Sequence, residues 1–508
     1  MKLSKTNFIT YLDCRKNAWL KIHRPDIYYE YPLSSFEQNI IETGNEIDVL
    51  ARDLFPGGVL IEDREDNELT QQLIDQQTKV IYQPVFTTDK FLTACDILVW
   101  NDDNSLYDLY EVKSSTASAT TEGSSRATKE YLTDIAFQKT VLTDSDVTVG
   151  QTYLIRLNKA FVRTGNINLQ ELFLIEDVSE EVEEIVNTIA DSMTTAYDYL
   201  VKETEPQGYC ECILRGLNSH CTTSAYSIPD LPDYPIHAIA RLGNSKTKFA
   251  ELVDSDTLDI QDIESGFFKV GSNYALQVGI AQSGIEHIDH ARIADFIADI
   301  EYPISYLDYE TYPSAIPRFE GYKPYQQIPF QFSLHVQQAP DSKLEHFEFL
   351  HVDSAIPDHN FVEALQNCLP TTGSIIVWNK TFECKIINSR LIERHPHYTD
   401  YFTEINDRVV DLMIPFSGNK KAGINIMYQH PDQRGSYSIK AVLPIFAPEL
   451  SYKSLGVQDG GTASDTWNRI VCGEFSDSER ETKCSELLDY CELDTLAMVK
   501  ILERLRTI

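Results

Sequence analysis

Residues 90–114, KFLTACDILVWNDDNSLYDLYEVKS, contain two strand-like runs, over 90–100 and 106–114. Between them stands the pentapeptide NDDNS, whose short polar side chains favour a turn. Two such runs around a turn predict a β-hairpin. The elements predicted to follow are a helix over 129–142, a strand over 148–157 and an amphipathic helix beginning at Ser179.

Three ionisable side chains occupy this hairpin: Asp96 on the first strand, and Glu111 and Lys113 on the second. Glu111 and Lys113 are two residues apart, so their side chains leave the same face of the strand. Asp96 and Glu111 can hold one Mg2+ or Mn2+ through hard oxygen ligands, and Lys113 can orient or activate an attacking water. Alone the motif is weak, because an ordinary surface hairpin can carry the same residues.

The following helix adds Gln138 to these three residues. The order acid, acid, lysine and helical glutamine resembles the PD-(D/E)XK, RecB-like nuclease superfamily. That resemblance implies a restriction-endonuclease-like domain that cuts phosphodiesters with a divalent metal. The histidine that the superfamily often carries near the start is absent from the comparable stretch, 44–48. We interpret Glu46 and Asp48 in that stretch as solvated helix residues rather than additional metal ligands.

Four cysteines flank the hairpin block: Cys14 precedes it, and Cys210, Cys212 and Cys221 follow the amphipathic helix. A reducing compartment favours metal or cluster ligation over disulfides. One cysteine before and three after resembles the iron–sulfur branch of RecB-like nucleases, including the CRISPR-associated exonucleases. The resemblance implies a structural 4Fe-4S cluster on these thiolates. The spacing departs from the usual pattern, with one residue between Cys210 and Cys212, so zinc and four free thiols remain as alternatives.

The second half of the chain predicts a layered α/β domain, because strands come first and helices lie between and after them. The strands are predicted over 304–309, 330–336, 344–350 and 374–378, and the helices over 382–394 and 481–505.

Carboxylates end two of these predicted strands and return on the last helix. Asp308 and Glu310 face the same way on their strand, and Glu383 follows another strand. Tyr490 and Asp494 are four residues apart, so they share a helix face. Two metals held by these carboxylates can clamp the attacking and leaving oxygens of a phosphodiester, while Tyr490 positions or deprotonates the water.

This order resembles the DEDD exonucleases of the RNase H-like (DnaQ-like) fold, in their tyrosine subtype, which cut from 3' to 5'. Glu383 stands where that family usually has aspartate, which puts the activity of the site in doubt. Asp411 is interpreted as a structural or substrate-side acid outside the catalytic set. The whole arrangement also resembles uncharacterised bacterial proteins that fuse the two kinds of domain.

The 508-residue chain has 78 acidic and 43 basic residues and a formal net charge of -35. This imbalance argues against a protein that coats duplex nucleic acid with its whole surface. It does not exclude a nuclease, because carboxylate-bound cations neutralise the scissile phosphate locally. No apolar run approaches the ~20 residues of a membrane span, and the N-terminus lacks a secretory signal pattern. We therefore expect a cytoplasmic protein without a membrane partner.

Three prolines within 229–235 mark a boundary, and the predicted domains are 1–225, a helical connector over 226–299, and 300–508. Our hypothesis is a metal-dependent dual nuclease in repair or defence, with DNA as the preferred partner and RNA as a possible one. No motif indicates a protein partner. The alternatives are a non-catalytic nucleic-acid-binding or scaffolding subunit and a hydrolase of short oligonucleotides.

Overall fold

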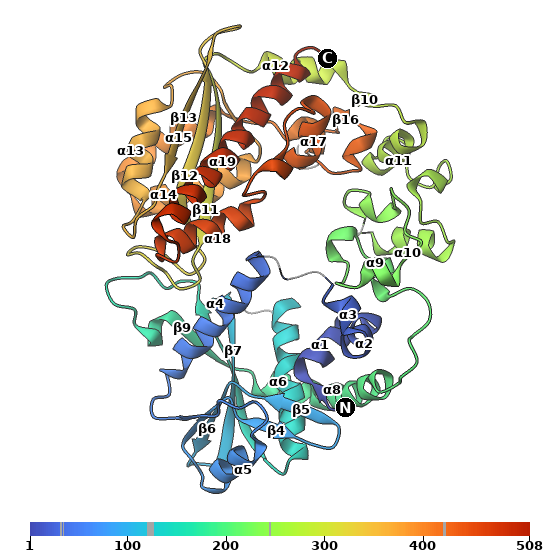
Figure 1. Ribbon diagram of the computed structural model, residues 1–508, viewed down its shortest axis with the longest axis vertical. Coiled ribbons are helices and arrows are strands. Elements are labelled where there is room, and N and C mark those ends of the chain that lie inside the picture. The colour runs from blue at the N-terminus through green and yellow to red at the C-terminus, as the bar shows by residue number, and fades with distance from the viewer. Residues whose placement is uncertain (31–32, 34, 119–125, 243–244, 420–422) are drawn as a thin grey trace. The chain divides into compact units, whose positions relative to one another are not determined.

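The computed structural model describes residues 1–30, 33, 35–118, 126–242, 245–419 and 423–508 (Figure 1). The chain separates into two compact units, each with helices and mixed sheets, which confirms the predicted α/β class at that level. Unit 1 comprises Met1–Ile213, His220–Pro229 and Ala315–Tyr325; unit 2 comprises Leu214–Ser219, Asp230–Ser314 and Gln326–Ile508. Residues 230–299, most of the predicted connector, therefore belong to unit 2.

A six-stranded mixed sheet forms the centre of unit 1, in the order β2-β3-β6-β7-β8-β9. Its long strand β7 (Leu106–Ala117) is antiparallel to β6 (Ile97–Asn101) and parallel to β8 (Val149–Asn158). The outer strands are β2 (Val59–Leu60), β3 (Val80–Tyr82) and β9 (Phe173–Asp177). A separate three-stranded sheet joins β1 (Leu3–Ser4), β5 (Phe91–Ala94) and β4 (Val85–Thr87).

The stretch 90–100, predicted as one strand, is two strands in different sheets, so that prediction was wrong. β5 pairs with β1 and β4, whereas β6 pairs with β3 and β7. The break falls at Cys95 and Asp96, where the Cys95 amide donates to the Pro84 carbonyl at 3.0 Å. Oδ2 of Asp96 accepts from the Val112 amide at 2.8 Å. Asp96 therefore stands at the junction of two sheets, tied to β7.

Helices cover both faces of the six-stranded sheet. Phe137 of α6 (Arg126–Asp144) and Met193 of α8 (Ser179–Leu200) share one apolar core with Leu109. Ile47 of α4 (Ser35–Arg52) shares the opposite core with Ile97. The alternation along β7 therefore turns Glu111 toward α6. The other helices of this unit include α1 (Lys5–Asp13), α2 (Arg15–His23), α3 (Pro25–Tyr28), α5 (Asn67–Asp75), α7 (Leu169–Leu172) and α9 (Ser224–Ser227).

Unit 2 is built on a five-stranded sheet in the order β13-β12-β11-β14-β15. The first three strands are antiparallel neighbours, and β11, β14 and β15 are parallel. A β-bulge between Glu310 and Thr311 interrupts the pairing of β11 with β12. The strand bounds are β11 (Ile304–Pro313), β12 (Gln327–Gln337), β13 (Leu344–Leu350), β14 (Ile375–Val377) and β15 (Val409–Asp411).

Alternate residues of β11 enter two different cores. Leu307 and Tyr309 pack with Phe361 of α13 (Asp358–Cys368), whereas Tyr306 packs with Met498 of α19 (Asp477–Leu505). Asp308 and Glu310 therefore point toward α19, which lies along this sheet in Figure 1.

The remaining helices of unit 2 contribute to these two cores or to a third apolar cluster, which contains Phe249 and Val278. The helix predicted over 382–394 begins as a π-helix, Thr381–Asn388, and continues as α14 (Ser389–Arg394). No helix among the residues described combines the length and apolar composition needed to cross a bilayer. The other elements include α10 (Lys246–Asp254), α11 (Asn273–Ser283), β10 (His287–Ile288), α12 (His290–Ala298), α15 (Thr399–Arg408), α16 (Ile414–Ser417), β16 (Tyr428–Gln429), α17 (Ile439–Phe446) and α18 (Gly460–Val471).

Candidate functional sites

The first carboxylate site is the group Asp96, Glu111, Lys113 and Gln138, which the fold of unit 1 brings together. Glu111 is its centre and is almost fully buried. Oε1 of Glu111 lies 2.8 Å from Nζ of Lys113 and 2.8 Å from Nζ of Lys5. Oε2 accepts from Nε2 of Gln138 at 2.6 Å. The strand pair and helix α6 thus deliver the predicted residues to one place.

Two members of this environment were missed from the sequence. Lys5 begins α1 directly after β1, and only the pairing of β1 with β5 carries it to Glu111. No local pattern in the sequence signals that pairing. Asp134 forms an ion pair with Lys113. It precedes Gln138 by four residues and so shares its helix face, which was a usable signal.

The two lysines and the two acids of this site determine one another's protonation. Burial, and next the charge of Glu111, raises the pKa of Asp96 to about 7. Burial also raises the pKa of Glu111, but Lys113 and Lys5 outweigh it, so the net shift is downward. Burial lowers the pKa of Lys113, yet Glu111 and Asp134 outweigh it and raise the pKa above its ordinary value. Glu111 is therefore ionised, and both lysines beside it are charged.

The stretch that aligns with the missing histidine contributes one residue to this environment. Glu46 is exposed, as predicted, but the interpretation of Asp48 as solvated was wrong. Asp48 is partly buried and ion-paired with Arg52, and its Oδ1 is buried without a hydrogen-bond partner. Nε2 of Gln83 lies 3.2 Å from Oδ2 of Asp48 and 3.5 Å from Oδ1 of Asp96. The carboxylate oxygens of these two aspartates and of Glu111 are hard donors, the kind that Mg2+ and Mn2+ prefer.

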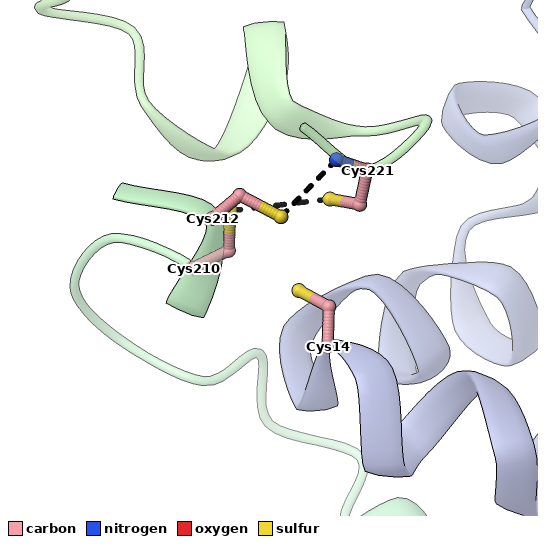
Figure 2. A group of neighbouring side chains, drawn as sticks. All are labelled: Cys14, Cys210, Cys212 and Cys221. Atoms are coloured by element: carbon pink, nitrogen blue, oxygen red, sulfur yellow. Dashed lines mark hydrogen bonds between the residues drawn. The ribbon is translucent and has the colours of Figure 1, made fainter. Parts of the chain in front are cut away.

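The thiolate centre is the group Cys14, Cys210, Cys212 and Cys221 of unit 1 (Figure 2). Cys14 lies between α1 and α2. Cys212 lies in the short 3-10 helix Glu211–Leu214 and Cys210 just before it, whereas Cys221 follows the next 3-10 helix, Leu217–Ser219. The four Sγ atoms all lie within 4.8 Å of one another. The fold therefore assembles all four predicted thiol ligands from the two ends of the unit.

The sulfurs of this centre are spaced for a small metal site. Sγ of Cys210 lies 4.0 Å from Sγ of Cys221, and the amide of Cys221 donates to Sγ of Cys212 at 3.1 Å. A tetrahedral zinc ion with Zn–S bonds of about 2.3 Å places its sulfurs roughly 3.8 Å apart. The observed spacing suits one such ion, and a cubane cluster would require the sulfurs to move apart. Four thiols are chemically suited to either group.

The second carboxylate site is the group Asp308, Glu310, Glu383 and Asp494 of unit 2. Asp308 and Glu310 come from β11, and their carboxylate oxygens lie within 4.8 Å of each other and of the Cys491 sulfur. Sγ of Cys491 contacts Oδ2 of Asp308 at 3.7 Å. The thiol on α19 thus places the helix directly against the carboxylates of β11.

Helix α19 supplies Asp494 and Tyr490, both buried. Oδ1 of Asp494 accepts a 2.6 Å hydrogen bond from the hydroxyl of Tyr452, a residue that the sequence did not suggest. Nζ of Lys440 lies 5.4 Å from the ring centroid of Tyr452 and 5.5 Å from that of Tyr490. One ammonium group therefore stands beside the aromatic side of the site.

Glu383 enters from the π-helix and is buried, and its Oε2 has no hydrogen-bond partner. Asp411 at the end of β15 accepts from the amides of Met413 at 3.0 Å and Lys380 at 3.4 Å. These bonds give Asp411 a structural role, which is one of the two alternatives predicted for it. The unsatisfied Glu383 oxygen is instead available to a ligand.

Burial and the charges of neighbouring acids raise the pKa values of the carboxyl groups in the second site. Burial, followed by the charge of Asp494, raises the pKa of Asp308 well above its usual value. Burial and then Asp308 act in the same way on Glu310 and on Glu383. Burial raises the pKa of Asp494 to about 6, although the Tyr452 hydrogen bond opposes the shift. Divalent cations stabilise the ionised form of such a carboxylate cluster, because their charge compensates for the water that burial removes.

A comparison with known protein families covers part of this site and assigns it no activity. Residues 305–438 match a domain of unknown function (DUF2779). That segment contains Asp308, Glu310 and Glu383, and it ends before Tyr490 and Asp494.

Two mycoplasma proteins are similar to parts of the chain. The first, "Uncharacterized protein MG366 homolog" of Mycoplasma pneumoniae, is 28% identical over 214 residues, which are 39% of this chain and 31% of that protein. The second, "Uncharacterized protein UU173" of Ureaplasma parvum, is 26% identical over 225 residues, 41% of this chain and 32% of that protein. The match thus spans about a third of the length of either relative.

Proposed function

We propose that this chain is a metal-dependent nuclease with two active sites. Unit 1 would be a RecB-like PD-(D/E)XK nuclease, and unit 2 an RNase H-like exonuclease of the DEDD type. One observation carries the proposal: Asp308, Glu310, Glu383 and Asp494 converge from three elements, with Asp308 partly buried and the others buried. The charge of Asp308 raises the pKa values of Glu310 and Glu383, and the charge of Asp494 raises those of Asp308 and Glu310. Buried carboxylates without compensating charge destabilise a fold, so a purely structural role does not explain this group.

Mg2+ or Mn2+ bound at these sites would neutralise the scissile phosphate and polarise its oxygens. In the second site, Asp308, Glu310, Glu383 and Asp494 would hold the ions, and Tyr452 orients Asp494. Burial, together with Asp494 and Glu310, raises the pKa of Tyr490 far above its ordinary value. Its hydroxyl therefore keeps its proton and positions a water by hydrogen bonding instead of removing a proton from it.

In the first site, Asp96 and Glu111 would hold one ion. Gln138 fixes the orientation of Glu111 through its 2.6 Å bond. Lys113 and Lys5 carry positive charge beside the same carboxylate, so they are placed to contact the phosphate. The positive charge needed for an anionic substrate is thus local, which is compatible with a net charge of -35 for the whole chain.

The proposed substrate is nucleic acid, with DNA preferred and RNA possible. The thiolate centre is proposed as a structural cofactor site that ties α1 and α2 to the segment after α8. Its occupant is a 4Fe-4S cluster or zinc, and the two differ in visible absorption and in the iron, sulfide and zinc content of anaerobically purified protein.

Cleavage of end-labelled single-stranded DNA and RNA with Mg2+ or Mn2+ tests the function. Wild type is compared with Lys113→Ala, Asp308→Ala and the double variant. Lys139→Ala is the control, because Lys139 lies on α6 but pairs with Glu183 at the surface. We expect each single variant to lose part of the activity and the double variant to lose all of it. A wild type inactive on both polymers, after anaerobic purification, would support a scaffolding protein instead.

A further inference from the structure

A second cluster of metal-ligand side chains lies in unit 2 outside the carboxylate sites. His335 on β12 pairs directly with His346 on β13, and their rings stack with centroids 4.4 Å apart. Glu492 of α19 completes the group, with Oε1 3.7 Å from Nδ1 of His346. One ligand atom from each of the three residues lies within 4.8 Å of the others.

One ring nitrogen of each histidine is hydrogen-bonded to a hydroxyl group. Nδ1 of His335 lies 2.8 Å from Oγ1 of Thr495, and Nε2 of His346 lies 3.0 Å from Oγ of Ser333. The two hydroxyls are 2.7 Å apart, and Thr495 also reaches the Glu492 carbonyl at 3.0 Å. Every bond is satisfied if both rings donate, Ser333 donates to Thr495, and Thr495 donates to that carbonyl.

This assignment of protons leaves a lone pair on Nε2 of His335 and on Nδ1 of His346. Neutral imidazoles whose outer N–H groups are held by hydrogen bonds are the usual form of histidine in metal sites. A carboxylate beside them completes a nitrogen and oxygen donor set typical of zinc and related transition metals.

We propose that His335, His346 and Glu492 bind a divalent transition-metal ion of the zinc type. Glu348 is two residues from His346 on β13, so it lies on the same face, and it interacts electrostatically with His346 and Glu492. Its carboxylate is the candidate fourth ligand. The side chains of His346 and Glu492 are 23% and 45% exposed, which gives an ion access from solvent.

The site is separate from the proposed nuclease chemistry but adjoins it. Ser333, which binds His346, lies opposite Asp308 in the pairing of β11 with β12. An ion here would order β13, β12 and α19 around the strand that carries the second carboxylate site. The inference does not depend on the nuclease proposal, because it rests on the histidines and their hydroxyl partners.

Titration of the full-length protein with Co2+ tests this assignment. Tetrahedral or five-coordinate Co2+ on histidine and carboxylate gives visible d–d bands without the ultraviolet charge-transfer band of cobalt thiolates. The variants are His346→Asn and Glu492→Gln, both at partly exposed positions. Glu481→Gln is the matched control, because Glu481 is an exposed glutamate of the same helix.

We expect the thiolate-free d–d signal in wild type, Glu481→Gln and Cys14→Ser. We expect at least a tenfold weaker Co2+ affinity in His346→Asn and Glu492→Gln, because the loss of a residue that only supports a metal ligand already weakens metal affinity by roughly that factor. The proposal is overturned if the two ligand variants titrate like wild type, or if the signal disappears in Cys14→Ser. It is also overturned if Asp308→Asn removes the signal while His346→Asn leaves it. The nuclease assay plays no part in this readout.

Discussion

The phenolic hydroxyl of Tyr452 donates a 2.6 Å hydrogen bond to Oδ1 of Asp494. Both side chains are buried, and the bond opposes the rise in pKa that burial imposes on the carboxyl group. The phenol thereby fixes one oxygen of Asp494, and a second hydrogen bond, from Tyr490, also acts on this carboxyl group. Tyr452 is a positioning residue for the second carboxylate site, since it acts through Asp494.

Tyr452→Phe is expected to lower the kcat of the second site about tenfold, because a hydrogen bond to a charged group contributes roughly 1.5–3 kcal/mol. The Mn2+ concentration needed for half-maximal cleavage should rise, while KM changes little. The assay uses Lys113→Ala as background, so that only the second site contributes.

Tyr428→Phe is the matched control for that substitution. The Tyr428 hydroxyl also donates a 2.6 Å bond to a carboxylate, Oε2 of Glu286, in the same unit. It should lose comparable stability and keep full cleavage with an unchanged Mn2+ requirement. Equal losses of cleavage in the two variants would remove the positioning role from Tyr452.

Local periodicity was enough to predict the elements that carry most of the candidate residues. The strand predicted over 344–350 is β13, with the same bounds, and the helix predicted from 481 is α19, which begins at Asp477. Glu111, Lys113 and Gln138 lie on such elements. A strand followed by the helix that packs on its sheet was therefore enough to predict that these three side chains lie close together.

Long-range pairing determines what the sequence did not reveal. The apolar run 90–100 has no local sign of a break, and the pairing of β5 with the N-terminal strand β1 divides it at Asp96. The same pairing delivers Lys5 to Glu111. Tyr452 reaches Asp494 from 42 residues away along the chain, with no spacing rule that connects them. These residues could be found only from the folded structure.

Lys5→Ala is expected to reduce cleavage by the first site at least about tenfold, because Glu111 loses one of its two ammonium partners. Lys5→Arg should keep part of the activity. Cleavage is measured in the Asp308→Ala background, with Lys2→Ala as the control, since Lys2 is exposed nearby. Undiminished or faster cleavage by Lys5→Ala would mean that Lys5 takes no part in cleavage and that its ammonium group only fills the position of the divalent cation when no metal is bound.

Glu383→Gln is expected to stabilise the protein when no Mg2+ or Mn2+ is added. The substitution removes a buried acid that repels Asp308 and lacks a hydrogen-bond partner. A gain of about 1 kcal/mol corresponds to a rise in Tm of roughly 2–4 °C. Added Mn2+ should raise the Tm of wild type more than that of Glu383→Gln. Glu363→Gln, at an exposed position of α13, should behave as wild type does in both measurements.

The same repulsion predicts how stability without added Mg2+ or Mn2+ depends on pH. The folded-state pKa of Asp494 is raised to about 6 from 3.8, so the folded protein binds a proton that the unfolded chain has released. The stability that Asp494 contributes through this extra proton is fully present below pH 3.8 and is lost as the pH rises through 6. Glu383 is shifted in the same direction. Between pH 5 and 8, Tm should fall more steeply for wild type than for Glu383→Gln, and equal slopes would contradict the electrostatic account.

Cys14→Ser tests whether the thiolate centre holds a metal that contributes to folding. Cys14 comes from the N-terminal helices, whereas its three partners follow α8, so a bound metal closes a long loop and its binding free energy adds to stability. We expect Cys14→Ser to lose the metal and to lower Tm by several degrees. Cys472→Ser changes an exposed thiol outside this group and should leave both quantities unchanged. Identical metal content and Tm in Cys14→Ser and wild type would leave the four cysteines as free thiols, because a site that loses one of four ligands cannot keep its affinity.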